Sequence, residues 1–305
     1  MSSILKAGVA GAGVFGGYHA KKYAELDGVE LVGVFDPDGV RAKTLADSLG
    51  VEAFTDLSEL LARIDVLTVA SPASTHAANA LAALAAGKPV YIEKPIATSL
   101  EDADKILIEA SKHGVPVGCG HQERVVFQAM GLFDVPETPL RLEAVRKGPA
   151  SDRSLDVSVV LDLMIHDIDL ALALTPAEPL TVEAEGAFVN NDTLDTVKAE
   201  ATFGDGFTAV FEASRVAEGR ERTMRIVYPS GVVEIDFVAR TFVNTTPFQL
   251  NEDFADTPAG KDPLGASVSG FLDAVRGLSP KPVVEAAEAA RALDLALAVE
   301  QAAGA

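Results

Sequence analysis

Short apolar runs alternate with amphipathic segments over the first 120 residues, and this alternation constrains the fold more than any other feature of the chain. The apolar runs, which we predict to be strands, are Leu5–Ala10, Val29–Phe35, Ile64–Ala70, Pro89–Ile92 and Val115–Gly120. Helical patterns lie between them at about Phe15–Leu26, Val40–Leu49, Ser58–Ala62, Thr75–Ala86 and Ser99–His113. Strands that alternate with helices build a parallel sheet with helices on both faces. This part of the chain is therefore predicted to be a doubly wound α/β domain.

A different pattern begins at about residue 122, where segments with alternating apolar and polar residues follow one another. The predicted strands are Leu140–Arg146, Thr181–Val189, Thr196–Phe203, Phe207–Ser214, Thr223–Val227 and Val232–Phe237. Turn residues separate several of them, which is typical of a largely antiparallel, open sheet. Helices are predicted at Val157–Leu174, Ala266–Gly277 and Val284–Ala302, and a loop at Pro247–Lys261. We therefore predict two domains, residues 1–121 and residues 122–305.

The charge balance limits the possible partners. The 305 residues carry a formal net charge of −20, which repels phosphate backbones and anionic membranes, so neither nucleic acid nor membrane is expected. The single cysteine, Cys119, excludes intramolecular disulfides and multi-cysteine metal sites, and we predict no metal. No apolar run is long enough to cross a membrane. The apolar segment after Lys6 resembles a signal peptide but fits a strand and glycine turn, so we expect a cytoplasmic protein.

A glycine-rich turn follows the first predicted strand. Its sequence, Gly11-Ala12-Gly13-Val14-Phe15-Gly16, fits the G-x-G-x-x-G pattern of dinucleotide-binding turns, in which the backbone approaches a pyrophosphate at a helix N-terminus. The expected acidic residue, Asp36, comes 20 positions after Gly16 at the end of the second strand. Its carboxylate can accept hydrogen bonds from a ribose and would repel a 2′-phosphate, although Arg41 lies close in sequence. We therefore predict NAD as the cofactor rather than NADP.

Further polar residues follow the later strands, at the carboxyl edge of the sheet where such folds bind ligands. Glu93 and Lys94 come directly after the strand Pro89–Ile92, which favours a positioned ammonium group over a solvated one. Ser71-Pro72 belongs to the same edge and is expected to border the nicotinamide. His76 opens the next helix and is predicted to cap or pack there, in contact with the cofactor, without acting in catalysis.

The predicted helix Val157–Leu174 carries ionisable residues within an otherwise apolar sequence. At about 100° per residue, Ser158, Asp162, His166 and Asp169 fall on one stripe, whereas Asp167 points the opposite way. Buried carboxylates and an imidazole cost free energy unless they pair with one another or contact a ligand. The stripe is therefore either a structural polar seam or part of a binding site.

Together these motifs make the chain resemble the Gfo/Idh/MocA oxidoreductases (glucose–fructose oxidoreductase, inositol dehydrogenase, rhizopine catabolism). The resemblance rests on the glycine turn Gly11–Gly16, the Glu93-Lys94-Pro95 motif and the Asp162-x-x-x-His166-x-x-Asp169 helix, in that order. It implies an N-terminal Rossmann domain and a C-terminal α/β domain whose open sheet mediates assembly into a homodimer or homotetramer. It also implies that the helix with Asp162 and His166 faces the nicotinamide across the interdomain cleft.

The resemblance makes Lys94, Asp162 and His166 the catalytic group, all three also contacting substrate. Oxidation of a secondary alcohol requires a hydride acceptor and a base for the hydroxyl proton. An imidazole such as that of His166 suits the role of base, and Lys94 can stabilise the developing alkoxide. Asp162 can orient the substrate or the imidazole. Either His166 or Lys94 can be the base.

Two segments are most similar to the nucleotide-sugar branch of the family, in particular to the UDP-N-acetylglucosamine 3-dehydrogenases of lipid A biosynthesis. They are Gly120-His121-Gln122-Glu123-Arg124 and the sequence of the helix that carries Asp162. The chain departs from that branch at Val125-Val126-Phe127, where Phe-Asn-Pro is usual. Arg124, and with less support Arg215, can meet a substrate diphosphate, and a surface or interdomain ion pair is an equally good interpretation of each. The alternatives in function are a polyol or inositol dehydrogenase, an NAD-recycling glycosidase-like enzyme and a non-catalytic NAD-binding regulator.

Overall fold

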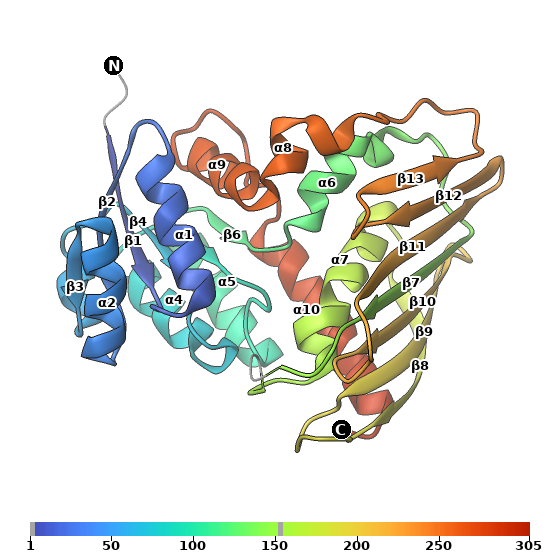
Figure 1. Ribbon diagram of the computed structural model, residues 1–305, viewed down its shortest axis with the longest axis horizontal. Helices are drawn as coiled ribbons and strands as arrows, with labels where there is room; N and C mark the ends of the chain where they lie inside the picture. Colours follow the sequence, from blue (N-terminus) through green and yellow to red (C-terminus); the bar gives the residue numbers. More distant parts are fainter. Residues whose placement is uncertain (1–3, 152–154) are drawn as a thin grey trace. The chain divides into compact units, whose positions relative to one another are not determined.

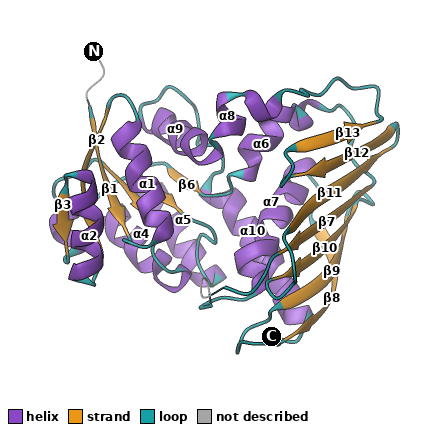
Figure 2. Cartoon of the chain, in the orientation of Figure 1, coloured by secondary structure: helices purple, strands orange, loops and turns teal. Residues whose placement is uncertain are grey.

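The computed structural model describes residues 4–151 and 155–305 and divides into two compact units. The first unit comprises Met1–Gly120 with Leu264–Ala290, and the second comprises His121–Pro263 with Arg291–Ala305. Figure 1 labels their helices and strands. Strands and helices alternate in the first unit, whereas the strands of the second gather in one large sheet (Figure 2). The predicted α/β fold class is thus confirmed.

The first unit contains a six-stranded sheet in the order β3-β2-β1-β4-β5-β6, in which every pairing is parallel. Its strands are β1 (Leu5–Ala10), β2 (Val29–Phe35), β3 (Glu52–Phe54), β4 (Val66–Val69), β5 (Val90–Ile92) and β6 (Val117–Cys119). This is the Rossmann order, with its switch point between β1 and β4. Five of these strands were predicted. The three-residue edge strand β3 was not, because only Phe54 of its residues is buried.

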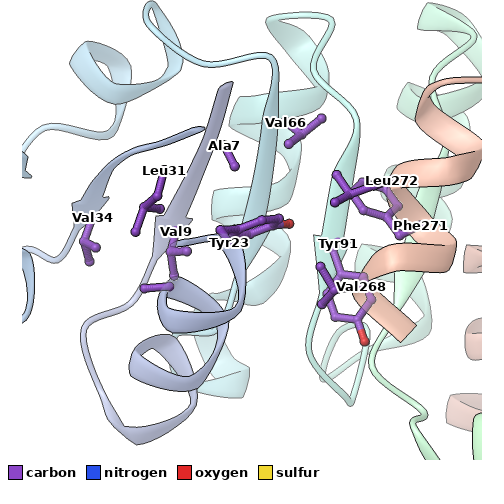
Figure 3. Close-up of a cluster of buried hydrophobic side chains, with 11 residues drawn as sticks. Ala7, Val9, Tyr23, Leu31, Val34, Val66, Tyr91, Val268, Phe271 and Leu272 are labelled. Atoms are coloured by element: carbon purple, nitrogen blue, oxygen red, sulfur yellow. The ribbon is translucent and has the colours of Figure 1, made fainter. Parts of the chain in front are cut away.

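The helices of the first unit are α1 (Val14–Glu25), α2 (Gly39–Leu49), α3 (Leu57–Leu61), α4 (His76–Ala85) and α5 (Leu100–His113). Helix α9 (Pro263–Val275) also contributes. Its side chains Val268, Phe271 and Leu272 pack with Tyr91 of β5 in a buried cluster that extends to β1 and β2 (Figure 3). The predicted boundaries assigned Leu264–Ala290 to the second domain; the structure groups it with the first, because these apolar side chains complete that core.

The second unit is built on a seven-stranded sheet in the order β13-β12-β11-β7-β10-β9-β8. The strands are β7 (Arg141–Lys147), β8 (Pro179–Ala187), β9 (Thr196–Phe203), β10 (Thr208–Ser214), β11 (Glu221–Tyr228), β12 (Gly231–Asp236) and β13 (Thr241–Asn244). Only the central β7–β10 pair is parallel. The largely antiparallel sheet was predicted, but the short edge strand β13 was not.

The helices of the second unit are α6 (Glu123–Met130), α7 (Ile165–Leu174) and α8 (Pro258–Lys261), with α10 (Ala286–Ala302) ending here. Helix α8 and the 3-10 turn Phe254–Asp256 lie within the segment predicted to be a loop. A π-helical turn, Val160–Met164, precedes α7. Ser158 starts this helical region, since its hydroxyl oxygen accepts hydrogen bonds from the backbone N–H of Val160 and Leu161. Within the described part of the chain, no helix is both long and apolar enough to cross a membrane.

Candidate active site

Each glycine of the turn after β1 is required for a different structural reason. A Cβ at Gly11, whose φ is +109°, would lie 2.6 Å from the Ala70 carbonyl oxygen, and one at Gly16 would lie 1.8 Å from the Gly11 carbonyl oxygen. Backbone packing therefore excludes a side chain at both positions. A Cβ at Gly13, in contrast, meets nothing within 4 Å. Gly13 leaves open space at the start of α1, as a closely approaching pyrophosphate requires.

The N-terminus of α1 is suited to an anion. Its N-cap residue, Gly13, offers no side-chain hydrogen bond, and the first turn contains no acidic residue. The exposed N–H groups and the positive end of the helix dipole thus remain for a ligand. Val14 and Phe15 of this turn are 49% and 41% exposed, so they leave apolar surface beside it. The predicted cofactor residues Gly11–Gly16 therefore fit the pyrophosphate of NAD.

Asp36 follows β2 at the same edge of the sheet and is buried. Its carboxylate accepts hydrogen bonds from the backbone N–H of Ala12 and Asp38, both at 2.9 Å, and pairs with the Arg41 guanidinium at 2.9 Å. Burial by itself would raise the pKa of Asp36, but these donors outweigh it and hold the pKa below its ordinary value. Asp36 is thus an anion in the folded chain, as recognition of a ribose by NAD-binding domains requires.

Glu93 and Lys94 follow β5, and the Lys94–Pro95 peptide bond is cis. Glu93 is buried, and its Oε1 lies 2.7 Å from Nε2 of the fully buried His19 on α1. Burial opposes ionisation of Glu93, yet the hydrogen bond with His19 and nearby positive charges lower its pKa. The Glu93 side chain therefore links the glycine-turn helix to the strand end that carries Lys94. Lys94 itself is half-buried.

His76 begins α4 and is buried at the edge where Ser71 and Pro72 follow β4. Its Nδ1 lies 2.7 Å from the Pro95 carbonyl oxygen, and its Nε2 lies 2.9 Å from that of Ser71. The ring therefore joins the loop after β4 to the loop after β5. This packing role is the one predicted for His76. Its contact with a cofactor, like those of Ser71 and Pro72, stays a prediction.

The ionisable residues predicted on this helix of the second unit differ in how deeply they are buried. Asp162, in the π-helical turn, and His166, on α7, are half-buried. Asp169 is buried and forms a bidentate ion pair with Arg124, with both N–O distances at 2.8 Å. Asp167 is buried and pairs in the same way with Arg146 of β7. Asp167 and Asp169 are therefore structural, and Asp162 and His166 are the members that retain access to solvent.

A carboxylate that the sequence analysis did not single out contacts His166. Glu123, the first residue of α6, places Oε2 2.8 Å from His166 Nδ1, while its Oε1 accepts a hydrogen bond from Arg146 Nη1 at 2.9 Å. The short distance places the imidazole and the carboxylate in direct contact. Burial would raise the pKa of Glu123, but His166 and Arg146 hold it well below its usual range.

Neither arginine predicted to meet a diphosphate is available for that role. Arg124 is buried and committed to Asp169, and Arg215 is buried with Nε 2.7 Å from Asp195 and Nη1 2.8 Å from the Val157 carbonyl oxygen. We therefore withdraw both assignments in favour of the ion-pair alternative. The sequence analysis offered ion pairs for both but could not identify the partners, because these lie 45 and 20 positions away in the chain.

Comparison with known proteins agrees with this geometry. The oxidoreductase family with an NAD-binding Rossmann fold matches residues 5–121, and the GFO/IDH/MocA C-terminal domain matches residues 133–234. The UDP-N-acetylglucosamine 3-dehydrogenase of Acidithiobacillus ferrooxidans is 37% identical over 284 residues, 90% of each chain. Its solved structure superposes with a TM-score of 0.90 over 99% of this chain and 98% of that one, at 35% identity. The myo-inositol 2-dehydrogenase of Thermotoga maritima is 28% identical over 264 residues, 80% of this chain and 79% of the relative.

The chain therefore belongs to the Gfo/Idh/MocA family and is an NAD-dependent dehydrogenase with a Rossmann cofactor domain. The predicted family, fold and cofactor are confirmed.

Proposed function

We propose that the protein oxidises a secondary alcohol of a nucleotide sugar, with the 3-position of UDP-N-acetylglucosamine as the best candidate. The observation that carries the proposal is the Glu123–His166 contact of 2.8 Å next to the half-buried Asp162. A carboxylate paired with an imidazole suits removal of a hydroxyl proton. The relative that is 37% identical over 90% of the chain supports the choice of substrate.

The Gly11–Gly16 turn and Asp36 would hold NAD, whose nicotinamide would supply the hydride acceptor. The other steps belong to side chains of this protein. With Nδ1–H of His166 directed toward Glu123, Nε2 keeps a lone pair and can take the hydroxyl proton. Lys94 then donates to the same substrate oxygen and stabilises negative charge on it. Asp162 orients the substrate by accepting a hydrogen bond from a neighbouring hydroxyl.

Glu123 is proposed as a positioning residue for His166. Arg146 donates a hydrogen bond to the Glu123 carboxylate and stabilises its negative charge. Arg146 is itself held by its ion pair with Asp167. An ionised partner at Nδ1 favours one tautomer and stabilises the imidazolium that forms when Nε2 takes a proton. A neutral side chain at position 123 would no longer stabilise the imidazolium of His166.

The catalytic assignment is tested by Lys94→Ala, His166→Ala and Glu123→Gln. Each of the first two is expected to lower kcat by about 100-fold or more, the usual scale for a positioned acid or base. Glu123→Gln should give a smaller loss that Glu123→Asp partly restores. NAD binding, followed by calorimetry, should persist in all four variants. Full turnover by the Lys94 or His166 variant would overturn its proposed role.

An inositol or other polyol is the second candidate substrate, because the Thermotoga maritima relative named as a myo-inositol 2-dehydrogenase covers 80% of the chain. NADH formation compared across UDP-sugars, free sugars and inositols separates the two. A preference for inositols over every UDP-sugar would favour this second function.

A further inference from the structure

The second unit contains a cavity of about 310 Å³ whose wall carries an unusual set of cations for so acidic a chain. Its lining comes from α6, β11, the turn between β12 and β13, and the α8 region, and includes Arg222, Arg240 and Lys261 with Phe237 and Phe254. Glu123 is its acidic member. Three positive side chains against one carboxylate make the cavity locally cationic within a protein of net charge −20. Its volume lies at the lower end of the range for small-molecule sites.

Arg222 is the central cation of this wall. On β11 it lies on the same side as the buried Met224 and Ile226, so it projects from the helix-covered face of the sheet. The guanidinium is half-buried and has no hydrogen bond or ion pair with any residue in the described ranges. Burial lowers the pKa of Arg222 and the charge of Arg146 lowers it further, whereas the carboxylates of Glu123 and Asp167 oppose the shift. A partly desolvated cation that has no ion-pair partner gains free energy when an anion binds beside it.

The Arg240 side chain is held by hydrogen bonds to two carbonyl groups. Arg240 has φ +60°, the left-handed conformation that is uncommon for a residue other than glycine. Its Nη2 donates hydrogen bonds to the carbonyl oxygens of Ala255, at 2.6 Å, and Gly260, at 2.5 Å. These bonds tie the turn between β12 and β13 to the 3-10 turn Phe254–Asp256 and to α8. Lys261 adds an exposed ammonium group, 3.3 Å from Asp256.

The cavity is joined to the candidate catalytic imidazole through Glu123. The same carboxylate that lies 2.8 Å from His166 Nδ1 also lines the cavity. A substrate that presents a hydroxyl to His166 can therefore extend into the cavity on the other side of Glu123. Any anionic group placed there meets Arg222, with the apolar surface of Phe237 and Phe254 nearby.

We propose that this cavity binds the diphosphate of a nucleoside-diphosphate sugar, with Arg222 as its principal ligand and Arg240 and Lys261 as supporting cations. The inference rests on the proposed function, because it specifies how the nucleotide part of that substrate is recognised. It also replaces the role first predicted for Arg124 and Arg215, which are committed to Asp169 and Asp195.

The test is calorimetric titration of the full chain with UDP, uridine and inorganic diphosphate. Arg222→Ala is expected to weaken UDP binding by about tenfold or more, because a hydrogen bond to a charged group contributes about 1.5–3 kcal/mol. Uridine and NAD should bind the variant as they bind the wild type. Lys261→Ala, at a side chain 62% exposed, removes a supporting cation without threatening the fold and should give a smaller loss.

Arg225→Ala is the matched control. Arg225 lies on the same strand as Arg222 but on the opposite face of the sheet, and it pairs with Glu234 and Glu143. Its removal takes away the same charge from β11 and should leave UDP binding unchanged. Arg222→Lys, which keeps the charge, serves in place of Arg222→Ala if that variant does not fold, and should bind UDP more weakly than the wild type.

The outcomes separate this inference from the proposed function. Equal UDP binding by wild type, Arg222 variants and Lys261→Ala would overturn the cavity assignment, even if UDP-sugars are oxidised. An equal loss in Arg225→Ala would also overturn it, because the effect would then be one of net charge. Arg222-dependent UDP binding without NADH formation from any UDP-sugar would support the cavity and contradict the proposed function.

Discussion

The ion pair between Asp36 and Arg41 bears directly on the preference for NAD over NADP. Arg41 pairs with Asp36 at 2.9 Å, and the Arg41 side chain is 59% exposed. While Asp36 is anionic it repels a 2′-phosphate and holds the guanidinium. Without that negative charge, the same guanidinium is a ready partner for a phosphate. The sequence predicted NAD from Asp36 and noted Arg41 nearby; the ion pair between them shows why Arg41 does not reverse that preference.

Replacing Asp36 with Asn is therefore expected to shift the cofactor preference. The amide keeps an acceptor for the Ala12 N–H but removes the charge, so kcat/KM with NAD should fall by about tenfold. With NADP it should rise, because Arg41 is released. Steady-state kinetics with both cofactors provide the measurement. The double variant Asp36→Asn/Arg41→Ala should lose the gain with NADP; an equal gain in the double variant would exclude Arg41 as its source.

His121 is a buried imidazole whose two ring nitrogens have no hydrogen-bond partner among the described residues. Burial is the main cause that lowers its pKa from the ordinary 6.5 to about 4, although Asp169 opposes this. The unfolded chain therefore binds more protons than the folded chain between these two values. It follows that His121 contributes full stability above about pH 6.5 and loses that contribution as the pH falls toward 4.

Chemical denaturation between pH 6.5 and 4 should show this effect. Within that window the free energy of unfolding should fall by up to about 1.4 kcal/mol per pH unit from His121 alone. The buried His76, whose pKa is also lowered, contributes with the same sign. The difference between wild type and His121→Phe therefore isolates the effect. Parallel pH profiles for the two proteins would contradict a buried, neutral His121.

At the scale of elements, two glycines of the turn between β1 and α1 have different roles. Gly16 is required by backbone packing, and Gly13 leaves space for the cofactor. Gly13→Ala should fold with an unchanged melting temperature, because its Cβ meets nothing within 4 Å. The new methyl group should nevertheless weaken NAD binding by tenfold or more, as it fills the space needed by the pyrophosphate. Gly16→Ala should be destabilised by about 3 kcal/mol, since its Cβ would overlap the Gly11 carbonyl oxygen.

Thermal melting and NAD titration of the two variants distinguish these roles. If Gly13→Ala bound NAD as tightly as the wild type, the turn would not hold the pyrophosphate in the way described.

Element prediction succeeded where the hydrophobic pattern was long and failed where it was short. Strands β1, β2 and β9 begin and end at the predicted residues, because each alternates or is buried over six to eight positions. Helix α6 was missed, since Val125, Val126 and Phe127 are typical of strands rather than helices. The π-helical turn at Asp162 was not predictable either, because it has no sequence signature and only lengthens one turn of an expected helix.

At the scale of the whole molecule, the position of each candidate site residue in the fold determines whether it could be inferred from the sequence. Residues that follow parallel strands, such as Gly13, Asp36 and Lys94, were predictable because strand ends meet at one edge of the sheet. The roles proposed for Glu123 and Arg222 were not predictable, because the neighbours of these residues come from elements distant in the sequence. For the same reason the sequence offered ion pairs for Arg124 and Arg215 without identifying Asp169 and Asp195 as the partners. That Lys94 and His166 act on one substrate, and that the open sheet mediates assembly into oligomers, both stay predictions.

The account's central claim, hydride transfer from the carbon 3 alcohol of a UDP-sugar to NAD, is tested most directly with an isotope. UDP-N-acetylglucosamine deuterated at carbon 3 is incubated with the protein and NAD, and the NADH formed is examined by mass spectrometry. The NADH formed by the wild type should carry one deuterium, and His166→Ala should form this NADH about 100-fold more slowly. NADH without deuterium, or no NADH from this or any other UDP-sugar, would contradict the claim.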